Sequence, residues 1–352
     1  MKILILTRYG QQGASSRLRS YQFFPYLFAA NIKCVSSSFF SDELLISKYN
    51  LSKYRLIDLI NAYYKRINIL LTAKNYDLIW IEKEALPWLP AWFEKWLLKN
   101  VKYTLDFDDA IFHNYDLTKN PLLRYFFWQR IDILMKSATL ITVGNTYLAN
   151  RAIDANAKNI EIIPTVIDIT RYSSKLSYSF TKTPIIVWIG SPTSLQYLLI
   201  HSKVFELLAL RHKFILRVIG GGNINITGVE IESLPWSLET ETSLIVESDI
   251  GIMPLRDTPW EQGKCAYKLI QYMACGLPTV ASPIGANKDV MIENVNGYFA
   301  STTNEWVDKL DLLLSDIDIR ERFGKANRIR VETNYCLQQI APKLVYIIKN
   351  IT

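Results

Sequence analysis

The stretch WEQGKCAYKLIQYMACGLPTVASPIGAN, Trp260–Asn287, decides the fold because it contains the parts of one βα unit in order. A glycine-containing loop, Glu261–Lys264, leads into an expected helix that begins near Ala266. Gly276 and Pro278 end this helix, since both residue types are common just beyond a helix C-terminus. An apolar strand then runs into the turn SPIG. The stretch therefore predicts an α/β fold.

The cations and backbone donors of this stretch also indicate an anion site. Backbone N–H groups at a helix N-terminus attract anions. Lys264 and Lys268 are four residues apart and are expected on one helix face, which Gln271 continues. The pattern predicts a diphosphate site, with an ordinary βα unit carrying solvated lysines as the alternative.

Alternation of short apolar strands with amphipathic helices extends outward from this stretch to both ends of the chain. Near-continuous apolar strands are typical of a parallel sheet that is covered on both faces. The expected strands are Lys2–Leu6, Ile32–Ser36, Leu78–Ile81, Lys102–Leu105, Leu140–Val143, Ile160–Ile163, Ile185–Ile189, Ile215–Ile219, Val229–Glu232, Ile250–Met253, Thr279–Ala281 and Tyr298–Ala300. The expected helices are Arg17–Ala29, Arg55–Ala73, Pro90–Leu98, Pro121–Met135, Thr146–Ile153, Ser194–Leu210, Leu238–Glu247, Ala266–Met273, Asn304–Leu314, Ile319–Thr333 and Leu337–Asn350.

The Ser/Thr-rich segment Tyr172–Thr183 interrupts this alternation and is interpreted as an interdomain linker. We therefore expect an N-terminal Rossmann-like domain over residues 1–170 and a C-terminal one over residues 171–335. Ligands of doubly wound domains bind beyond the carboxyl ends of the strands. That rule places the expected site in a central cleft that the two domains face.

Length and composition limit the class of protein. The 352 residues are 49% hydrophobic and 21% charged, which suits two cores and not a disordered chain. The net charge of +7 fits a phosphate-bearing ligand or an anionic membrane, with a basic proteome as the alternative, and no concentrated basic arm indicates nucleic acid. Four cysteines without CxxC spacing favour a reducing cytosol. We expect no signal peptide, no transmembrane helix and no metal site.

Two motifs in the first half carry candidate ligand-binding residues. In GASSRLR, after the first expected strand, Ser15, Ser16 and Arg17 suit a diphosphate or an acceptor, although exposed arginines are common. In DFDD, Asp106–Asp109, a carboxylate could hydrogen-bond sugar hydroxyls, and a helix N-cap or turn is the alternative. A short DxD motif also binds a metal in GT-A glycosyltransferases, which lack a second Rossmann half. The neighbouring His113 is interpreted as incidental.

Two motifs in the second half follow expected strands. Gly190, Ser191 and Pro192 of GSPT connect a strand to a helix, where glycine permits close backbone approach and the helix offers N–H groups. An ordinary βα loop is the alternative. Trp236 follows another strand and could border a nucleobase, with a core tryptophan as the alternative.

Tryptophans at steps of four mark the stretch LPWLPAWFEKWLLKN, Leu86–Asn100. Trp88, Trp92 and Trp96, with nearby lysines, could place a helix at a membrane surface. A helix that docks on a sheet would produce the same stripe.

The Trp260–Asn287 stretch resembles the donor site of family 4 glycosyltransferases, particularly bacterial members with a W-E-x-G-K-C-x-x-K-L-x-x-Y-M-A-x-G-x-P pattern. Nearly the whole chain takes part in the resemblance. The other matching segments are SSRLRSYQ, DFDDA, IPTVID, WIGSP, DIGIMPL and NGYFA.

The resemblance implies a GT-B fold, with a helix over about 336–352 returning to the first domain. It implies a nucleotide-sugar donor in the second domain, an acceptor in the first, and retention at the anomeric carbon without a metal or cofactor. The implied donor and phosphate contacts are Ser15, Ser16, Arg17, Gly190, Ser191, Pro192, Trp236, Gly263, Lys264, Lys268 and Gln271. The implied acceptor contacts are Arg19, Glu82, Glu84 and Asp108, and the implied catalytic residues are Asp106, Asp109, Glu261 and Lys264.

The chain departs from the family pattern at two places. The family's glutamate pair falls on Gly263 and Gln271, so contact with the sugar is expected to move to the loop that contains Glu261. A neutral Gln271 would bind hydroxyls less strongly than a carboxylate. The cations that the family carries after the first strand of the second domain are also missing. Lys264 and Lys268 are therefore expected to neutralise the charge of the phosphates.

We therefore expect a retaining, metal-independent glycosyltransferase that extends a glycan or a lipid-linked glycan in cell-surface polysaccharide synthesis. A catalytically silent sugar-nucleotide-binding protein and a nucleotide-sugar epimerase on the same fold are the alternatives. The expected location is the cytoplasm, with peripheral contact to the inner membrane left open.

Overall fold

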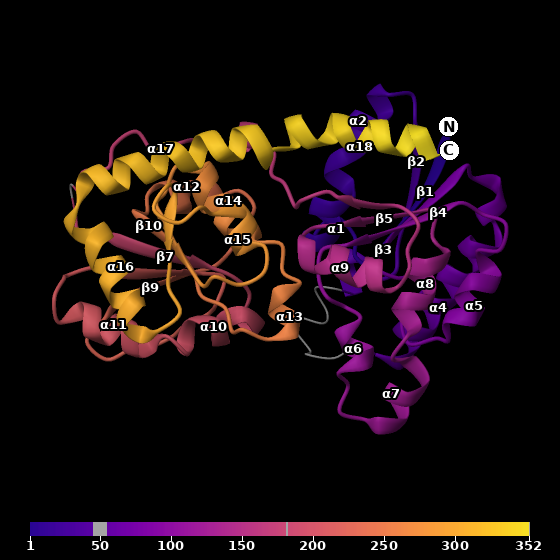
Figure 1. Cartoon of the computed structure of the whole chain (residues 1–352), viewed down its shortest axis with the longest axis horizontal. Coiled ribbons are helices and arrows are strands. Elements are labelled where there is room, and N and C mark those ends of the chain that lie inside the picture. Colours follow the sequence, from indigo (N-terminus) through magenta and orange to yellow (C-terminus); the bar gives the residue numbers. More distant parts are fainter. Residues whose placement is uncertain (45–54, 181, 352) are drawn as a thin grey trace. The chain divides into compact units, whose positions relative to one another are not determined.

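The chain forms two α/β units in the computed structural model, which describes residues 1–44, 55–180 and 182–351. Unit 1 comprises Met1–Thr165, Gln262–Cys265 and Ile340–Thr352. Unit 2 comprises Val166–Glu261 and Ala266–Gln339. Figure 1 shows a twisted sheet with helices around it in each unit. The predicted two-domain α/β architecture is confirmed.

Unit 1 contains a six-stranded parallel sheet in the order β2-β1-β3-β4-β5-β6. Its strands are β1 (Lys2–Thr7), β2 (Lys33–Ser38), β3 (Leu78–Glu82), β4 (Tyr103–Phe107), β5 (Leu140–Val143) and β6 (Ile160–Ile162). Every residue of β3, β4 and β5 is buried, as the apolar runs predict. The chain moves from β1 to β2 on one side and then to β3 on the other. The carboxyl ends of β1 and β3 therefore flank a topological switch point.

The helices of unit 1 are shorter than the sequence periodicity predicts. They are α1 (Ala14–Arg19), η1 (Tyr21–Phe23), α2 (Phe24–Ala29), α4 (Leu56–Leu71), η2 (Ala73–Asn75), α5 (Ala91–Leu97), α6 (His113–Asp116), α7 (Pro121–Phe127), α8 (Arg130–Ser137) and α9 (Thr146–Asp154). The single helix expected over Arg17–Ala29 is wrong, because Ser20 leaves the helical region at φ −131° and ψ −65°. The helix expected over Pro121–Met135 is likewise two helices, separated at Gln129.

Unit 2 contains a second six-stranded parallel sheet, in the order β12-β11-β10-β7-β8-β9. Its strands are β7 (Ile185–Ile189), β8 (Ile215–Ile219), β9 (Glu230–Leu234), β10 (Ile250–Met253), β11 (Thr279–Ala281) and β12 (Gly297–Phe299). The chain runs from β7 through β8 to β9 and then returns to β10 on the opposite side of β7. The switch point of this unit therefore lies between β7 and β10.

The helices of unit 2 follow the predicted positions, with one division. They are η3 (Ile169–Arg171), η4 (Pro192–Ser194), α10 (Leu195–Leu199), α11 (Ser202–Ala209), α12 (Glu241–Val246), α13 (Pro259–Gln262), α14 (Tyr267–Ala274), α15 (Asn287–Val290), α16 (Thr303–Ser315) and α17 (Ile317–Asn334), followed by α18 (Leu337–Ile351), which begins in unit 2 and continues into unit 1. The helix expected over Ser194–Leu210 is divided at Ile200 and His201.

The segment expected to link the domains packs inside unit 2 instead. The Lys175 ammonium contacts the Asp249 carboxylate at 2.8 Å, and the buried Tyr178 hydroxyl donates to the Gly276 carbonyl at 3.0 Å. Thr181, within the predicted linker, lies outside the described residues. The low periodicity of this segment therefore reflects irregular packed structure.

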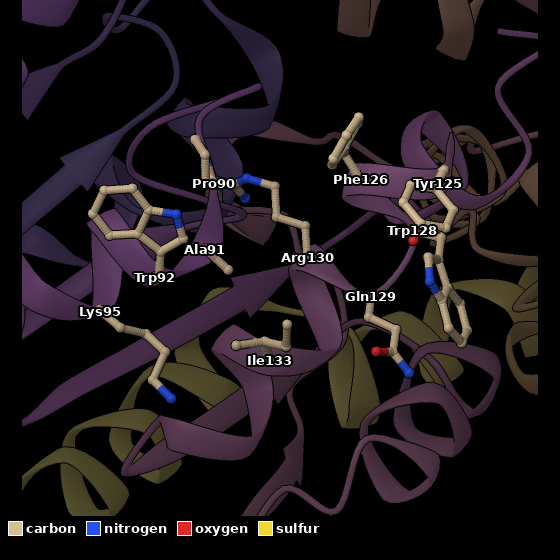
Figure 2. Close-up of a pocket in the computed structure, with 10 residues that line it drawn as sticks. All are labelled: Pro90, Ala91, Trp92, Lys95, Tyr125, Phe126, Trp128, Gln129, Arg130 and Ile133. Carbon is tan, nitrogen blue, oxygen red and sulfur yellow. The ribbon is translucent and has the colours of Figure 1, made fainter. Parts of the chain in front are cut away.

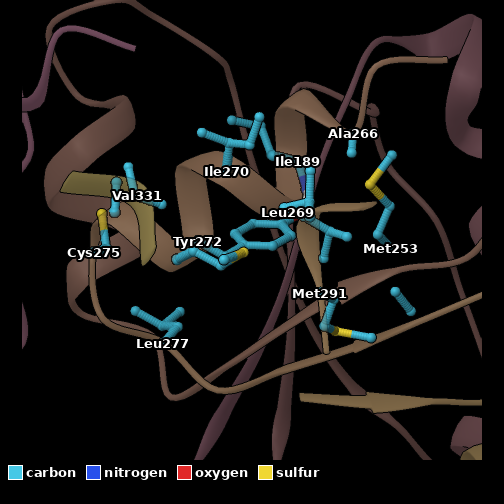
Figure 3. Close-up of a cluster of buried hydrophobic side chains, with 14 of the residues drawn as sticks. Ile189, Met253, Ala266, Leu269, Ile270, Tyr272, Cys275, Leu277, Met291 and Val331 are labelled. Carbon is cyan, nitrogen blue, oxygen red and sulfur yellow. Dashed lines mark hydrogen bonds between the residues drawn. The ribbon is translucent and has the colours of Figure 1, made fainter. Parts of the chain in front are cut away.

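Helix α14 forms the centre of the main core of unit 2. Figure 3 shows Leu269, Ile270 and Tyr272 from this helix in contact with buried residues such as Ile189. Its N-cap residue is Ala266, whose φ of 54° is left-handed and cannot belong to an α-helix. Lys264 therefore precedes the helix, and the prediction that Lys264 and Lys268 share one helix face is wrong.

Helix α18 returns to unit 1 as predicted, since its residues from Ile340 onward belong to that unit. Lys343 forms an ion pair with Glu161 at 3.7 Å, and the Lys102 ammonium donates to the Ile351 carbonyl at 3.4 Å. Across residues 1–44, 55–180 and 182–351, no helix has both the length and the apolar character needed to cross a bilayer.

Candidate functional site

A buried polar cluster lies at the carboxyl ends of β1 and β3 in unit 1. The Glu82 carboxylate accepts hydrogen bonds from the Ser15 hydroxyl at 2.7 Å and the Ser16 hydroxyl at 2.5 Å. It also accepts a bond from the Arg8 backbone N–H at 2.9 Å. Burial raises the pKa of Glu82, and Lys83 opposes that shift. The structure thus brings together three residues that the sequence assigned to the donor or the acceptor.

Lys83 joins this cluster to the carboxylates that follow β4. Its ammonium lies 2.9 Å from Asp108 and 3.5 Å from Asp109. Burial alone would raise the pKa of Asp108, but Lys83 and Arg19 hold it below its ordinary value. The pKa of Asp109 is raised by burial and by Asp108, against the effect of Lys83. Because the Asp109 side chain is 32% exposed, it is the carboxylate of this cluster best able to contact a ligand.

Arg19 and Asp106 form a buried bidentate ion pair under the cluster. The guanidinium donates to the two Asp106 oxygens at 2.6 and 2.8 Å, and the Thr142 hydroxyl donates to Asp106 at 2.6 Å. Both charged side chains are 2% exposed. These contacts fit a structural role for both residues better than the catalytic and acceptor-binding roles, which stay predictions. Asp106, the first carboxylate of the DxD motif, is therefore paired with a cation of the protein, Arg19.

Glu84 has different main partners from Glu82, although Arg8 links the two, through its guanidinium 3.8 Å from Glu84 and its backbone N–H on Glu82. Its carboxylate accepts bonds from the Arg130 guanidinium at 2.7 Å and from the Tyr115 hydroxyl at 2.7 Å. Arg130 also donates to Glu94 at 2.7 Å. These bonds hold α5 and α8 together and account for the burial of Glu84 without a ligand. Contact of Glu84 with an acceptor stays a prediction.

The segment Gln262–Cys265 packs beside DFDD within unit 1. The Asn145 amide donates to the Lys264 carbonyl at 3.0 Å, and the Cys265 thiol lies 3.1 Å from the Asp108 carbonyl. A Cβ on Gly263 would lie 2.7 Å from the Ala110 backbone nitrogen. Gly263 is therefore required by packing here. The Lys264 charge opposes the rise that burial causes in the pKa of Asp109.

Arg17 and His113 have protein partners in the structure. The Arg17 guanidinium donates to the Gln11 carbonyl at 3.3 Å. The His113 ring contacts the Asp116 carboxylate at 2.7 Å and the Tyr147 hydroxyl at 2.8 Å. These neighbours explain His113 as part of the local packing.

A lysine, a tryptophan ring and a glycine lie close together after β7 in unit 2. The Lys268 ammonium lies 4.4 Å from the centre of the Trp188 ring and 3.5 Å from the Ser194 hydroxyl. A Cβ on Gly190 would lie 2.7 Å from the Lys268 nitrogen. The missing side chain therefore lets Lys268 approach the backbone after β7. Ser191 is exposed just after Gly190, and the exposed Pro192 begins η4.

Trp236 and Gln271 meet in a second polar network of unit 2. The Trp236 indole N–H donates to Glu241 at 2.6 Å, and the Tyr172 hydroxyl donates to the same carboxylate at 2.8 Å. The Gln271 amide lies 3.4 Å from the Tyr172 hydroxyl. Trp236 is 41% exposed, so part of this residue is accessible while its N–H is bonded to Glu241.

The fourth predicted catalytic residue, Glu261, is buried in unit 2. Its carboxylate accepts a bond from the Tyr197 hydroxyl at 2.5 Å and contacts the Thr258 hydroxyl. Glu241, Tyr172 and Tyr197 were missed by the sequence analysis. Their roles depend on contacts between residues that are distant in the sequence, so no motif signals them.

The amino-acid sequence matches one described protein family and one curated protein. Residues 183–316 match the family described as Glycosyl transferases group 1. Over 78 residues the chain is 35% identical to spore coat protein SA of Bacillus subtilis (strain 168), a match that covers 21% of each chain. The matched region thus spans about a fifth of that curated relative.

Solved structures resemble the chain over nearly its whole length. A glycosyltransferase from Rickettsia africae ESF-5 has a TM-score of 0.71 at 16% identity, covering 99% of this chain and 98% of that one. Anabaena HepE, in complex with UDP and glucose, has a TM-score of 0.67 at 13% identity, covering 99% and 100%. At these identities the likeness establishes the fold. Residues 183–316 therefore form a domain of the group 1 glycosyl transferase type, and the chain as a whole has the two-domain GT-B fold.

Proposed function

We propose that this protein transfers a sugar, with retention and without a metal ion or cofactor, from a nucleotide-diphosphate sugar to a glycan or lipid-linked glycan in cell-surface polysaccharide synthesis. The main support is the position of Lys268 at the switch point of unit 2, in contact with Ser194 and the Trp188 ring and where a side chain on Gly190 would collide with it. A cation beside a glycine loop is suited to a phosphate group. The complex of HepE with UDP and glucose supports a nucleotide-sugar donor.

The chemistry requires stabilisation of a departing nucleotide diphosphate. Negative charge grows on the phosphate as the bond to the anomeric carbon breaks, and a fixed cation stabilises it most in a site that excludes water. The aromatic ring beneath Lys268 orients the ammonium and adds a cation–π contact. We infer that the leaving phosphate takes the acceptor proton, which is how the retaining family is thought to work and requires no protein nucleophile.

Unit 1 is the proposed acceptor side. Asp109 is a partly exposed carboxylate with a raised pKa, held beside Lys83 and Asp108. A carboxylate accepts hydrogen bonds from sugar hydroxyls and so can position the attacking oxygen. A lipid-linked acceptor would bring the enzyme to a membrane surface, which the exposed aromatic residues of unit 1 support.

Two alternatives are less well supported. The silent-partner alternative depends on Gly263 and Gln271 in place of acids. Close packing of Gly263 on Ala110 gives a structural reason for that glycine, which weakens the alternative. The epimerase alternative would need a histidine available for catalysis near the acids, whereas His113 is engaged by Asp116 and Tyr147.

The test is incubation of the protein with a panel of nucleotide sugars and a glycan acceptor, followed by measurement of free nucleotide and of the product's anomeric configuration. Turnover with retention supports the proposal, whereas binding without release of nucleotide supports the silent partner. The same assay with and without a chelator tests metal independence.

Two variants locate the donor phosphate. Lys268→Ala should weaken binding of the nucleotide diphosphate about 10- to 100-fold, since a hydrogen bond to a charged group contributes about 1.5–3 kcal/mol. Lys264→Ala should also weaken it if both cations contact the donor. Lys203→Ala, which removes an exposed lysine of the same unit, is the matched control. Unchanged affinity in both Lys264→Ala and Lys268→Ala would contradict the phosphate assignment.

A further inference from the structure

Helix α7 of unit 1 is apolar, yet none of its residues is buried. Its sequence is PLLRYFF, and Leu122, Tyr125 and Phe126 are 69%, 76% and 72% exposed. The helix is nevertheless well formed, because the Asn120 side chain caps it by accepting bonds from two backbone N–H groups. Phe127 is its main anchor, in ring contact with Trp88 and Tyr115. The exposed aromatic side chains therefore do not serve the core of unit 1.

A hollow of about 420 Å³ lies beside α7. Residues of α5 and α8 line it together with the exposed aromatic residues. Figure 2 shows Trp92 on one side of the hollow and Tyr125 with Trp128 on the other. Trp92 is 69% exposed, so the alternative that this tryptophan stripe docks on the sheet is wrong. Trp88 lies outside α5, in a left-handed conformation, and does not continue the stripe.

The floor of the hollow is held rigidly. Arg130 reaches it from α8, and its guanidinium donates to Glu84 and Glu94 at 2.7 Å each. It also donates to the Leu86 and Leu89 carbonyls at 2.5 and 2.6 Å. The aromatic walls are therefore attached to a fixed base, so they do not need a ligand in order to be organised.

The exposed charges on α5 and in the segment of α7 have one sign, and the nearby Asp116 and Asp132 are each paired with Arg151. On α5 and over residues 119–129, the charged residues are Lys95, Lys119, Arg124 and Glu94. Glu94 is fully buried against Arg130, so the exposed charges of both segments are all basic. Lys99 adds another exposed cation just after α5. Two copies of this surface placed face to face would bring cations together, which disfavours self-association.

We propose that these exposed side chains, Trp92, Trp96, Tyr125, Phe126 and Trp128, form an aromatic surface that docks on a bilayer containing anionic lipids. Tryptophan and tyrosine are favoured at the boundary between headgroups and acyl chains. Lysine and arginine at the rim of such a surface attract anionic headgroups. This surface is argued from its own residues and does not rest on the proposed function.

The first test is co-sedimentation of the full chain with vesicles of phosphatidylcholine alone or mixed with phosphatidylglycerol. We expect binding to the mixed vesicles, weaker binding to the neutral ones, and loss of the difference at high salt. No sugar nucleotide is present, so failure here leaves the transferase assay unaffected. Absence of binding to both vesicle types would overturn the proposal.

The second test uses paired variants of exposed residues. Tyr125→Ser with Phe126→Ser should weaken vesicle binding at least about tenfold through the loss of buried apolar area. Leu176→Ser with Leu210→Ser removes apolar side chains of unit 2 that are 99% and 83% exposed, and should leave binding unchanged. Equal losses in both pairs would contradict the assignment to this surface.

A third test concerns the basic rim. Lys95→Gln and Arg124→Gln should each weaken binding to the anionic vesicles about fivefold and leave binding to neutral vesicles unchanged. Analytical ultracentrifugation without lipid tests whether a second copy of the chain covers this surface instead. Concentration-dependent dimers that the Tyr125→Ser, Phe126→Ser variant abolishes, together with no vesicle binding, would show a protein interface instead.

Discussion

The candidate sites of the two units use charge in different ways. In unit 1, Arg19 contacts Asp106 and Lys83 contacts Asp108, so both of these buried cations have a carboxylate within 3 Å. In unit 2, the cation after β7 is Lys268, which lies over an aromatic ring beside a glycine. Ion pairs inside the protein stabilise its structure, whereas we propose that the cation beside a ring, a hydroxyl and a glycine binds an anion. The predictions below test this contrast, from the largest expected effect to the smallest.

Removal of the buried cation of unit 1 should cost mainly stability. Arg19→Leu leaves Asp106 charged and buried, and the free energy of unfolding should fall by about 3–5 kcal/mol in urea denaturation. Lys325→Leu removes an exposed partner of Glu321 and should change it by about 1 kcal/mol at most. An equal loss of unfolding free energy in the two variants would mean that the buried Arg19–Asp106 pair stabilises the protein no more than the exposed Lys325–Glu321 pair.

Asp109 should be the exception in unit 1, because it is partly exposed. Asp109→Asn should lower kcat/KM for the acceptor about 10- to 100-fold with little change in unfolding free energy. The wild-type rate should fall as the pH drops through the pKa of Asp109, since protonation removes a lone pair that accepts the acceptor's hydroxyl. Burial raises that pKa, so the fall should come at a higher pH than for an ordinary aspartate. A pH profile of Asp109→Asn identical to that of the wild type would exclude this role.

The glycine of unit 2 should matter for the donor. Gly190→Ala places a Cβ 2.5 Å from the Ser194 hydroxyl and 2.7 Å from the Lys268 nitrogen. Displacement of Lys268 should weaken nucleotide-diphosphate binding about tenfold, which calorimetry would measure. Gly222→Ala is a control, because no atom lies within 4 Å of the position that its Cβ would take, although its φ of 90° adds backbone strain. A stronger loss of affinity in Gly222→Ala than in Gly190→Ala would contradict the steric explanation.

The smallest expected effect concerns the neighbour of Trp236. Glu241→Gln keeps the side-chain size but weakens the bond from the indole N–H, and should lower nucleotide affinity about fivefold, equivalent to about 1 kcal/mol. Glu239→Gln, an exposed carboxylate two residues earlier, is the control. If affinity depends on the sugar but not on the base of the nucleotide, Trp236 does not border the base.

The sequence predicted the sheets closely because buried parallel strands are continuous apolar runs. The bounds of β5, β7, β8, β10 and β11 agree with the prediction to the residue. The helices were less well predicted, since period alone does not reveal a break such as that at Ser20 or Gln129. The apolar pattern of the sequence continues across each break, whereas the helical conformation of the backbone does not.

By itself the sequence determined the two parallel sheets, the returning C-terminal helix and the segments that follow each strand. Only the tertiary structure decided which charges act together. Ala266 adopts a left-handed conformation, which separates Lys264 from the helix of Lys268 and leaves it in unit 1 beside Asp109. Glu82 and Glu84, two residues apart, accept hydrogen bonds from different side chains, Ser16 and Arg130. The physical reason is that strand patterns depend on local burial, whereas ion pairs depend on distances between residues far apart in the chain.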